Sequence, residues 1–413
     1  MTLATSLRAL RHRDFRLFTA GQAVSLVGTW MQMVAQGWLI YRLTGSPAVL
    51  GLATCLGQLP VLLLAPVGGL LVDRIPARRL LLATQTLAML LASVLGLLTL
   101  AHRVQLWQVL AAAFALGLVN AFDNPGRQVF VWQAVPREDL LNAVALNASV
   151  LNGARILGPA LAAILVALAG EGWCFLLNGG SYLAVIGALL CLRSRPRPVR
   201  DAAAGSSLGQ LRAGFAFAGR TLPIRNLLLI LGCLSLACTS YVALMPVFAG
   251  RVLHGGPGAM GLLMGASGVG ALVGSLALVL RKQSGGLSGW VAGAAVLFGA
   301  GLLGFACSRS LMLSALLLVP VGCAFMVATA SINTFIQMMV PDRFRGRVMA
   351  LYTVMFLGMV PVGGLLVAGL ARCLGPAGTV ALAGAGALLA GAVFALSLTP
   401  AWGAPGPSLI KAL

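Results

Sequence analysis

The chain has few charged residues and very few acidic ones. Only 9% of its 413 residues are charged, and Asp and Glu together number 8. Soluble globular chains have roughly 25% charged residues, so these few ionic groups would not cover a water-exposed surface of this size. The composition argues against a soluble enzyme, a nucleic-acid-binding protein or a chain with a large soluble domain.

Residue patterns typical of metal, redox and nucleotide sites are missing as well. The 8 cysteines form no C-x-x-C pair, and the 3 histidines fall in predicted loops or termini. The sequence has no G-x-x-x-x-G-K-[ST] phosphate-binding loop and no H-E-x-x-H zinc motif. We therefore expect no enzyme activity, no metal and no cofactor, and an ATP-driven pump would need a separate subunit.

Hydrophobic residues make up 60% of the chain and recur in long runs. A transmembrane helix needs about 20 mainly apolar residues, so the chain has enough for about twelve. We predict an all-α, polytopic membrane protein whose span boundaries are good to a few residues. The predicted spans are 16–41, 48–71, 79–101, 105–130, 141–168, 173–192, 225–250, 258–280, 288–307, 311–338, 346–370 and 376–398.

Basic residues are unequally divided between the two sides of these spans. One side has 22 of the 28 Lys and Arg residues, the other has 5, and Arg155 lies inside a span. Basic loops stay in the cytoplasm, so we predict that both termini are cytoplasmic. The net charge of +20 then reflects topology and contact with anionic lipid headgroups, not binding of nucleic acid.

The two halves of the chain resemble each other. A polar linker at 193–224 separates a predicted N-terminal bundle of six helices at 1–192 from a C-terminal bundle and short tail at 225–413. At an offset of 205 residues, both Val-Pro turns coincide, and Gly158 falls on Gly363. Two parallel six-helix repeats are typical of transporters with a site between the halves.

The loop after the second span has the sequence GGLLVDRIPARR. Its G-x-x-x-D-R-x-x-x-R-R spacing resembles the signature loop of the major facilitator superfamily, although Pro76 replaces a usual glycine and Leu278 replaces the acid in the second half. The spacing is formed by Gly69, Asp73, Arg74, Arg78 and Arg79. The resemblance implies a conformational latch on the cytoplasmic side, whereas for Arg78 and Arg79 a purely topological role is equally open.

A longer motif extends from the fourth span into the fifth. It resembles the branch of the superfamily that contains the enterobactin exporter and related drug exporters, including part of an antiporter motif in the fifth helix. The matching residues are Asp123, Pro125, Arg127, Asn142, Asn152, Arg155, Gly158 and Pro159. The resemblance implies a secondary transporter that exports amphipathic small molecules, siderophores or drugs, in exchange for protons.

A charge inside the bilayer is costly unless it is paired or lines a cavity, so Arg155 needs an explanation. Counted along the helices, Asp123 lies within roughly 6 Å of the same depth, and we predict an interior ion pair between the two. The pair either couples transport to a proton or an anionic substrate, or is a permanent structural pair. An interior arginine also slightly favours anionic cargo.

The first span has polar residues at spacings of three or four, which place them on one helical face. They are Gln22, Ser25, Thr29, Gln32 and Gln36. In lipid such a stripe must face protein or water, so we expect it to line a substrate cavity, with contact between helices as the alternative. Asn152, Asn333 and Gln337 are further cavity candidates.

Taken together, these patterns predict a transporter of the major facilitator fold. We expect a monomer in a bacterial inner membrane with a small-molecule substrate and coupling to the proton gradient. A lipid or lysolipid flippase of the same fold is the main alternative, because it would differ chiefly in a cavity open to the bilayer. A membrane receptor or enzyme without transport activity is a remoter one.

Overall fold

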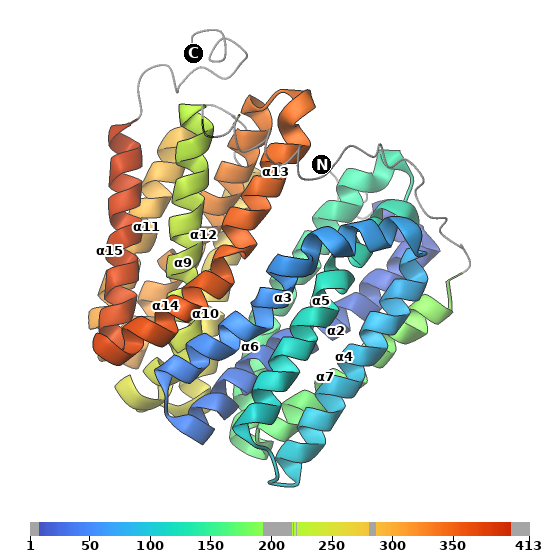
Figure 1. The fold of residues 1–413 in the computed structure, drawn as a ribbon, viewed down its shortest axis with the longest axis horizontal. Helices are drawn as coiled ribbons and strands as arrows, with labels where there is room; N and C mark the ends of the chain where they lie inside the picture. Colours follow the sequence, from blue (N-terminus) through green and yellow to red (C-terminus); the bar gives the residue numbers. More distant parts are fainter. Residues whose placement is uncertain (1–7, 193–216, 218, 220, 281–285, 398–413) are drawn as a thin grey trace. The chain divides into compact units, whose positions relative to one another are not determined.

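The computed structural model describes residues 8–192, 217, 219, 221–280 and 286–397, and the regular structure within these ranges is entirely helical (Figure 1). The predicted all-α fold is thus confirmed. The long helices of the first half are α2 (Arg13–Thr44), α3 (Pro47–Arg74), α4 (Ala77–Leu100), α5 (Leu106–Ala134), α6 (Leu140–Ala169) and α7 (Glu171–Leu190). Those of the second half are α9 (Leu222–Val247), α10 (Gly256–Leu280), α11 (Leu287–Cys307), α12 (Leu311–Met339), α13 (Asp342–Leu357), α14 (Met359–Cys373) and α15 (Gly375–Leu396).

Within the described ranges, 11 helical segments are long and apolar enough to cross a membrane. They agree with eleven of the twelve predicted spans to within a few residues. The first predicted span coincides with α2, which is long enough but is less apolar than these 11 segments because of its stripe of Gln, Ser and Thr side chains. The chain is therefore a multi-pass membrane protein.

The predicted span 346–370 differs from the structure. The helix begins earlier, at Asp342, and is interrupted at Gly358, so that α13 and α14 form one broken segment. Pro361 accounts for the break, because it has no N–H to donate and its ring conflicts with the carbonyl of Leu357 four residues before it.

The chain divides into two compact units. The first unit comprises Met1–Ser46, Leu56–Ala202 and Gly256–Gly265, and the second comprises Pro47–Cys55, Ala203–Gly255 and Ala266–Leu413. Most of the predicted linker at 193–224 lies outside the described residues, so the domain boundaries proposed from the sequence stay a prediction.

Glycines allow close helix packing within the first unit. A Cβ atom at Gly21 would lie 2.7 Å from the carbonyl oxygen of Ala184, and one at Gly28 would collide with Asn178, both on α7. Helix α2 therefore approaches α7 at backbone distance, as small residues permit in membrane bundles. Phe18 on α2 also packs against Phe130 on α5, with ring centroids 4.3 Å apart.

The second unit is packed in the same way. Helices α10 and α12 touch through Gly270, Gly274 and Gly322, where an added Cβ atom would collide with the backbone of the facing helix. Gly299 of α11 and Gly384 of α15 bring a second pair of helices together. Such contacts rely on van der Waals packing, because lipid offers no hydrophobic driving force between helices.

Candidate functional site

Asp123 on α5 is the centre of a buried polar cluster in the first unit. Its side chain is 1% exposed. One carboxylate oxygen, Oδ1, accepts hydrogen bonds from Thr84 Oγ1 at 2.7 Å and from Gln85 Nε2 at 2.8 Å. The other, Oδ2, is paired with Nε of Arg127. A carboxylate this deep in a membrane protein is costly unless it is paired, and here two hydrogen bonds and one ion pair stabilise it.

The predicted ion pair between Asp123 and Arg155 is wrong. Arg127 takes the place of Arg155, because residues four apart on one helix lie on the same face and meet with little loss of side-chain freedom. Arg155 instead lies over the ring of Trp30, with its guanidinium carbon 5.7 Å from the ring centroid. Among the residues that the structure describes, no carboxylate forms an ion pair with Arg155.

A second group of polar side chains joins α2 to α7 in the same unit. Asn178, which is fully buried, donates to Gln32 Oε1 at 2.6 Å and to the hydroxyl of Tyr182 at 3.4 Å. The hydroxyl of Tyr182 is also in hydrogen-bond contact with Thr29. Gln32 thus takes part in a contact between helices, and the hydroxyl of Thr29 donates to the carbonyl of Ser25 on its own helix. A role of either residue in a cavity stays a prediction.

The rest of the α2 stripe is arranged differently. Gln22 and Ser25 are 2% and 0% exposed, and their side-chain oxygens have no hydrogen-bond partner among the described residues. Gln36 is half-buried. Buried polar atoms without partners are costly, so Gln22 and Ser25 are the members of the stripe best suited to meet a ligand or water. Their role in a cavity stays a prediction.

Sequence reasoning found Asp123 and Arg127 but missed the residues that hold them. Thr84 and Gln85 were absent from the candidates, as were Asn178 and Tyr182. The signal was present, because Thr84 and Gln85, together with Thr86, interrupt the otherwise apolar run LLLATQTLAML of α4. A polar pair in the middle of a span must find a protein partner.

The antiporter-like motif in α6 proves to be a close contact with α2. A Cβ atom at Gly158 would collide with that of Trp30 and lie 2.9 Å from the carbonyl oxygen of Val27. Pro159 is buried and Asn152 is half-buried. In the second unit, the amide of Gln337 donates to Asn333 one turn earlier on α12. Asn333 is half-buried and Gln337 is exposed.

The signature loop after α3 is described in part. The side chains of Asp73 and Arg74 lie outside the described residues, so the latch stays a prediction for them. Arg78 donates to the carbonyl of Leu190 at 3.0 Å, at the end of α7. A cation at the carboxyl end of a helix interacts favourably with its dipole, which gives Arg78 a packing role within its own unit, whereas Arg79 is exposed.

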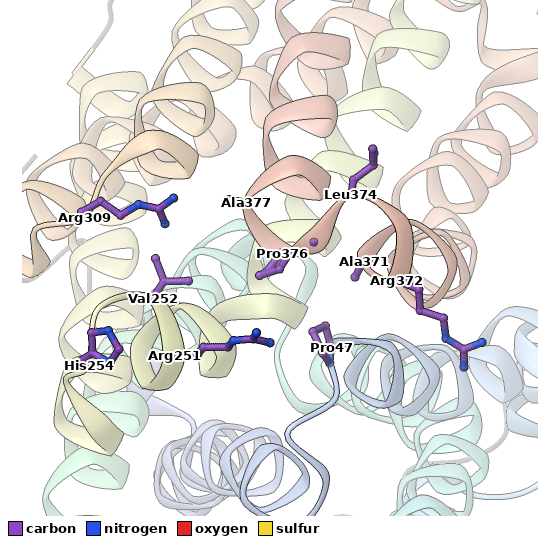
Figure 2. A pocket seen from close by; sticks show the side chains of 11 residues that line it. Pro47, Arg251, Val252, His254, Arg309, Ala371, Arg372, Leu374, Pro376 and Ala377 are labelled. Carbon is purple, nitrogen blue, oxygen red and sulfur yellow. The ribbon is translucent and has the colours of Figure 1, made fainter.

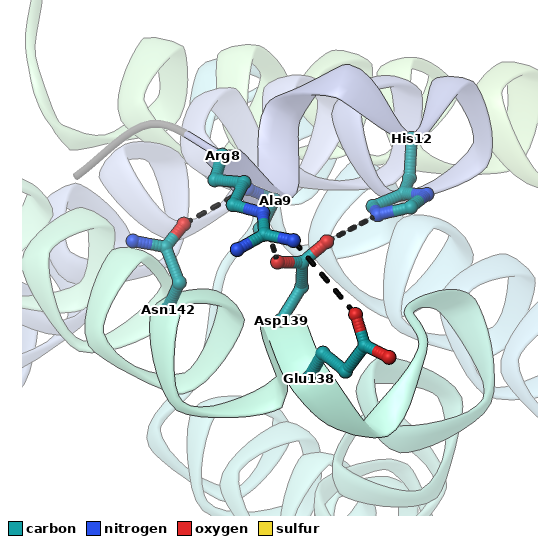
Figure 3. A network of polar contacts seen from close by, with 6 residues as sticks. All are labelled: Arg8, Ala9, His12, Glu138, Asp139 and Asn142. Carbon is teal, nitrogen blue, oxygen red and sulfur yellow. Dashed lines mark hydrogen bonds and ion pairs between the residues drawn. The ribbon is translucent and has the colours of Figure 1, made fainter. Parts of the chain in front are cut away.

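The short helix η1 (Arg8–Arg11) is fastened to the turn between α5 and α6, which contains η2 (Arg137–Asp139). Figure 3 shows Asp139 between Arg8 and His12, at 2.9 Å from Arg8 Nε and 2.8 Å from His12 Nε2. The backbone N–H of Ala9 also donates to Asn142 at 2.9 Å. We call Arg8, Ala9, His12, Asp139 and Asn142 the terminal clasp.

Comparisons with known proteins give a consistent result. A family model described as transmembrane secretion effector matches residues 4–407. The staphyloferrin A transporter of Staphylococcus aureus is 24% identical over 357 residues, which cover 85% of this chain and 88% of that protein. The enterobactin exporter EntS of Citrobacter koseri is 26% identical over 396 residues, 94% of this chain and 92% of its own. Macrolide efflux protein A of Streptococcus pyogenes is 30% identical over 151 residues, 37% of each chain.

Solved structures show the same fold. A bacterial homologue of the human lysosomal transporter Spinster, in an inward-facing and occupied conformation, has a TM-score of 0.72 at 14% identity and covers 94% of this chain and 96% of its own. The nucleoside transporter NupG has a TM-score of 0.72 at 13% identity, covering 93% and 98%. At these identities the likeness concerns the fold alone.

Proposed function

Because the chain belongs to the transmembrane secretion effector family of the major facilitator superfamily, we propose that it exports an amphipathic small molecule in exchange for protons. Transport would proceed by alternating access of the two helical units. The observation that carries the coupling is the buried carboxylate of Asp123, with its two hydrogen bonds and its ion pair. A buried carboxylate among membrane helices is a candidate proton carrier.

The contacts of Asp123 suggest how a proton would act. Oδ1 is occupied by two neutral donors, Thr84 and Gln85. Oδ2 is occupied by the cation of Arg127, so a proton and Arg127 compete for the same oxygen. Protonation turns this oxygen from an acceptor into a donor and releases Arg127, which is 21% exposed and able to move.

The cargo is proposed from two observations. The relatives named above are described as carrying siderophores or a macrolide. In this chain, Arg155 is a cation whose contact is an aromatic ring, not an acid. A guanidinium that no carboxylate neutralises favours an anionic siderophore over a cationic drug.

The membrane topology that we propose follows from the distribution of basic residues. We place the protein in a bacterial inner membrane as a monomer, with both termini in the cytoplasm, because 22 of 28 basic residues lie on one side of the spans. These basic residues would contact anionic lipid headgroups.

Uptake into inverted membrane vesicles tests this function. Vesicles containing the protein should accumulate radiolabelled enterobactin or erythromycin when a pH gradient, acidic inside, is imposed. Nigericin, which dissipates the gradient, should abolish uptake, and vesicles from the host without the protein are the control. Failure of both compounds to accumulate above this control would overturn export of siderophores and macrolides.

A further inference from the structure

One end of the second unit has an open basic pocket, lined mainly by the segment after α9, the turn between α11 and α12, and the junction of α14 and α15. The cavity is about 670 Å³, within the usual range of roughly 300–1,000 Å³ for small-molecule sites. Figure 2 shows Arg251, Arg309 and Arg372 around the start of α15, where Pro376 lies. We call this cavity, with His254 on its wall, the arginine pocket, and its lining residues all belong to the second unit.

Two of the three arginines lie on well-anchored segments, and all three side chains are exposed. Arg251 is in η3 (Phe248–Val252), which is anchored by Phe248 against Phe305 at 4.6 Å between ring centroids, and both rings are fully buried. Arg309 is in the turn between α11 and α12, where Ser314 donates to Ser308 at 2.9 Å. Packing and hydrogen bonding thus anchor the backbone that carries Arg251 and Arg309, and their exposed side chains are accessible to a ligand.

Besides the three arginines, the first turn of α15 contributes positive electrostatic potential to the pocket. Gly375, Pro376 and Ala377 line the pocket, and they form the N-terminus of a helix of 22 residues. Unpaired N–H groups at a helix N-terminus favour anions. This end is fastened by Thr379, whose hydroxyl donates to the carbonyl of Gly375 at 2.7 Å.

No acidic residue of the second unit lies near this charge. The second unit has one acidic residue in its sequence, Asp342. It begins α13, at the opposite end of α12 from Arg309, and α12 is roughly 40 Å long. Opposite charges that far apart are screened at physiological salt. The pocket thus concentrates positive charge with no internal counter-ion.

We propose that the arginine pocket binds a multiply charged oxyanion, with phosphate or carboxylate groups gripped by the three guanidinium groups. Guanidinium matches both groups in a bidentate manner. The charge bias of the loops places Arg251, Arg309 and Arg372 among the five basic residues on the predicted outer side. The ligand is either a free anion in the outer aqueous phase or the headgroup phosphate of an anionic phospholipid.

Binding to the purified full-length protein tests the proposal without any transport assay. Calorimetric titrations use sodium citrate and inorganic phosphate at 50 mM and 300 mM NaCl. In parallel, native mass spectrometry compares how much phosphatidylglycerol and how much phosphatidylethanolamine stay bound to the protein. The pocket variant is R251Q/R309Q/R372Q, and the control R16Q/R103Q/R225Q removes the same charge from three exposed arginines elsewhere.

The two sources give different results. If the ligand is a free anion, citrate or phosphate should bind the wild type and the control variant equally and should bind the pocket variant at least tenfold more weakly. This binding should also weaken at the higher salt concentration. If the ligand is a lipid headgroup, the wild type and the control variant should retain phosphatidylglycerol in the mass spectrometer, and the pocket variant should lose it. If the pocket variant does not fold, the single variant R309Q should bind the same ligand at least threefold more weakly than the single control variant R103Q. Equal binding to pocket and control variants, or no binding at all, overturns the proposal.

Discussion

Asp123 and Arg127 form an ion pair within a single helix, one turn apart on α5. Because both partners move with α5, the pair opens by a side-chain movement alone. We predict that Asp123→Asn removes the dependence of transport on the pH gradient. Proteoliposomes are prepared with enterobactin either in the lumen or in the external buffer. In both cases the variant should still equilibrate the substrate across the membrane but should not concentrate it when a pH gradient is imposed.

Glu171→Gln is the matched control for this experiment. Glu171 is also a buried carboxylate, 6% exposed, and binds Arg42 at 2.8 Å through an ion pair in the same unit. Loss of this second carboxylate should leave the response to the pH gradient within twofold of the wild type. Unchanged gradient dependence in Asp123→Asn would rule out Asp123 as the proton carrier.

The same pair predicts a stability effect. Arg127→Gln leaves the buried Asp123 carboxylate with only Thr84 and Gln85, and removal of one partner from a buried pair costs about 3 kcal/mol. Asp123→Asn with Arg127→Gln should recover more than half of that loss, because no charge is then left unpaired. Unfolding in SDS titrations measures both, and a double variant as unstable as the single one would contradict the pairing.

The fold was predictable from the sequence because each span is a local property. Runs of about 20 apolar residues indicate a helix wherever they occur, and the described helices lie within a few residues of the predicted spans. The break at Gly358 was not predicted, although Pro361 signalled it. The break interrupts the helix but leaves the run of apolar residues intact, and only that run defined the predicted span.

The contacts were less predictable because they depend on rotation about each helix axis. Counting residues gave the depths of Asp123 and Arg155, but depth says nothing about which way a side chain points. Arg127 was counted as a topological base near the end of a span, and the structure places it inside α5. The arginine pocket was not predictable from the sequence either, because Arg251, Arg309 and Arg372 come from three segments that are far apart in the chain.

Gly158 and Gly153 offer a test of packing on one helix. Gly158→Ala would place a methyl group against Trp30 of α2, whereas a Cβ atom at Gly153 meets nothing within 4 Å. We expect Gly158→Ala to lower the free energy of unfolding by about 1–3 kcal/mol through overpacking. Gly153→Ala should be neutral or slightly stabilising, since alanine is the better helix former. Equal effects in SDS titrations would refute the close contact.

Arg155 should influence cargo selection more than stability. Its contact with Trp30 is worth about 1 kcal/mol, and no described acid depends on it. We predict that Arg155→Gln reduces vesicle uptake of enterobactin at least tenfold and that of erythromycin less than twofold. Arg155→Lys keeps the charge and should retain most of the uptake. An equal loss for both compounds would argue against recognition of anionic cargo.

The terminal clasp should protect η1 from proteolysis. Asp139 is 6% exposed, forms an ion pair with Arg8 and is hydrogen-bonded to His12, so Asp139→Ala removes both contacts and frees η1 to unfold locally. We expect trypsin to cleave after Arg11 at least fivefold faster in this variant, as measured by the rate at which the N-terminal fragment appears.

Glu138→Ala is the control for the clasp, because Glu138 is the adjacent acid and is 83% exposed, 3.8 Å from Arg8. An exposed pair of this kind contributes little, so its loss should change the cleavage rate less than twofold. Asp139→Asn separates charge from hydrogen bonding: an intermediate rate would show that the ion pair carries part of the protection. Equal rates for Asp139→Ala and Glu138→Ala would mean that η1 is held by the packing of Ala9, which is fully buried, and not by the clasp.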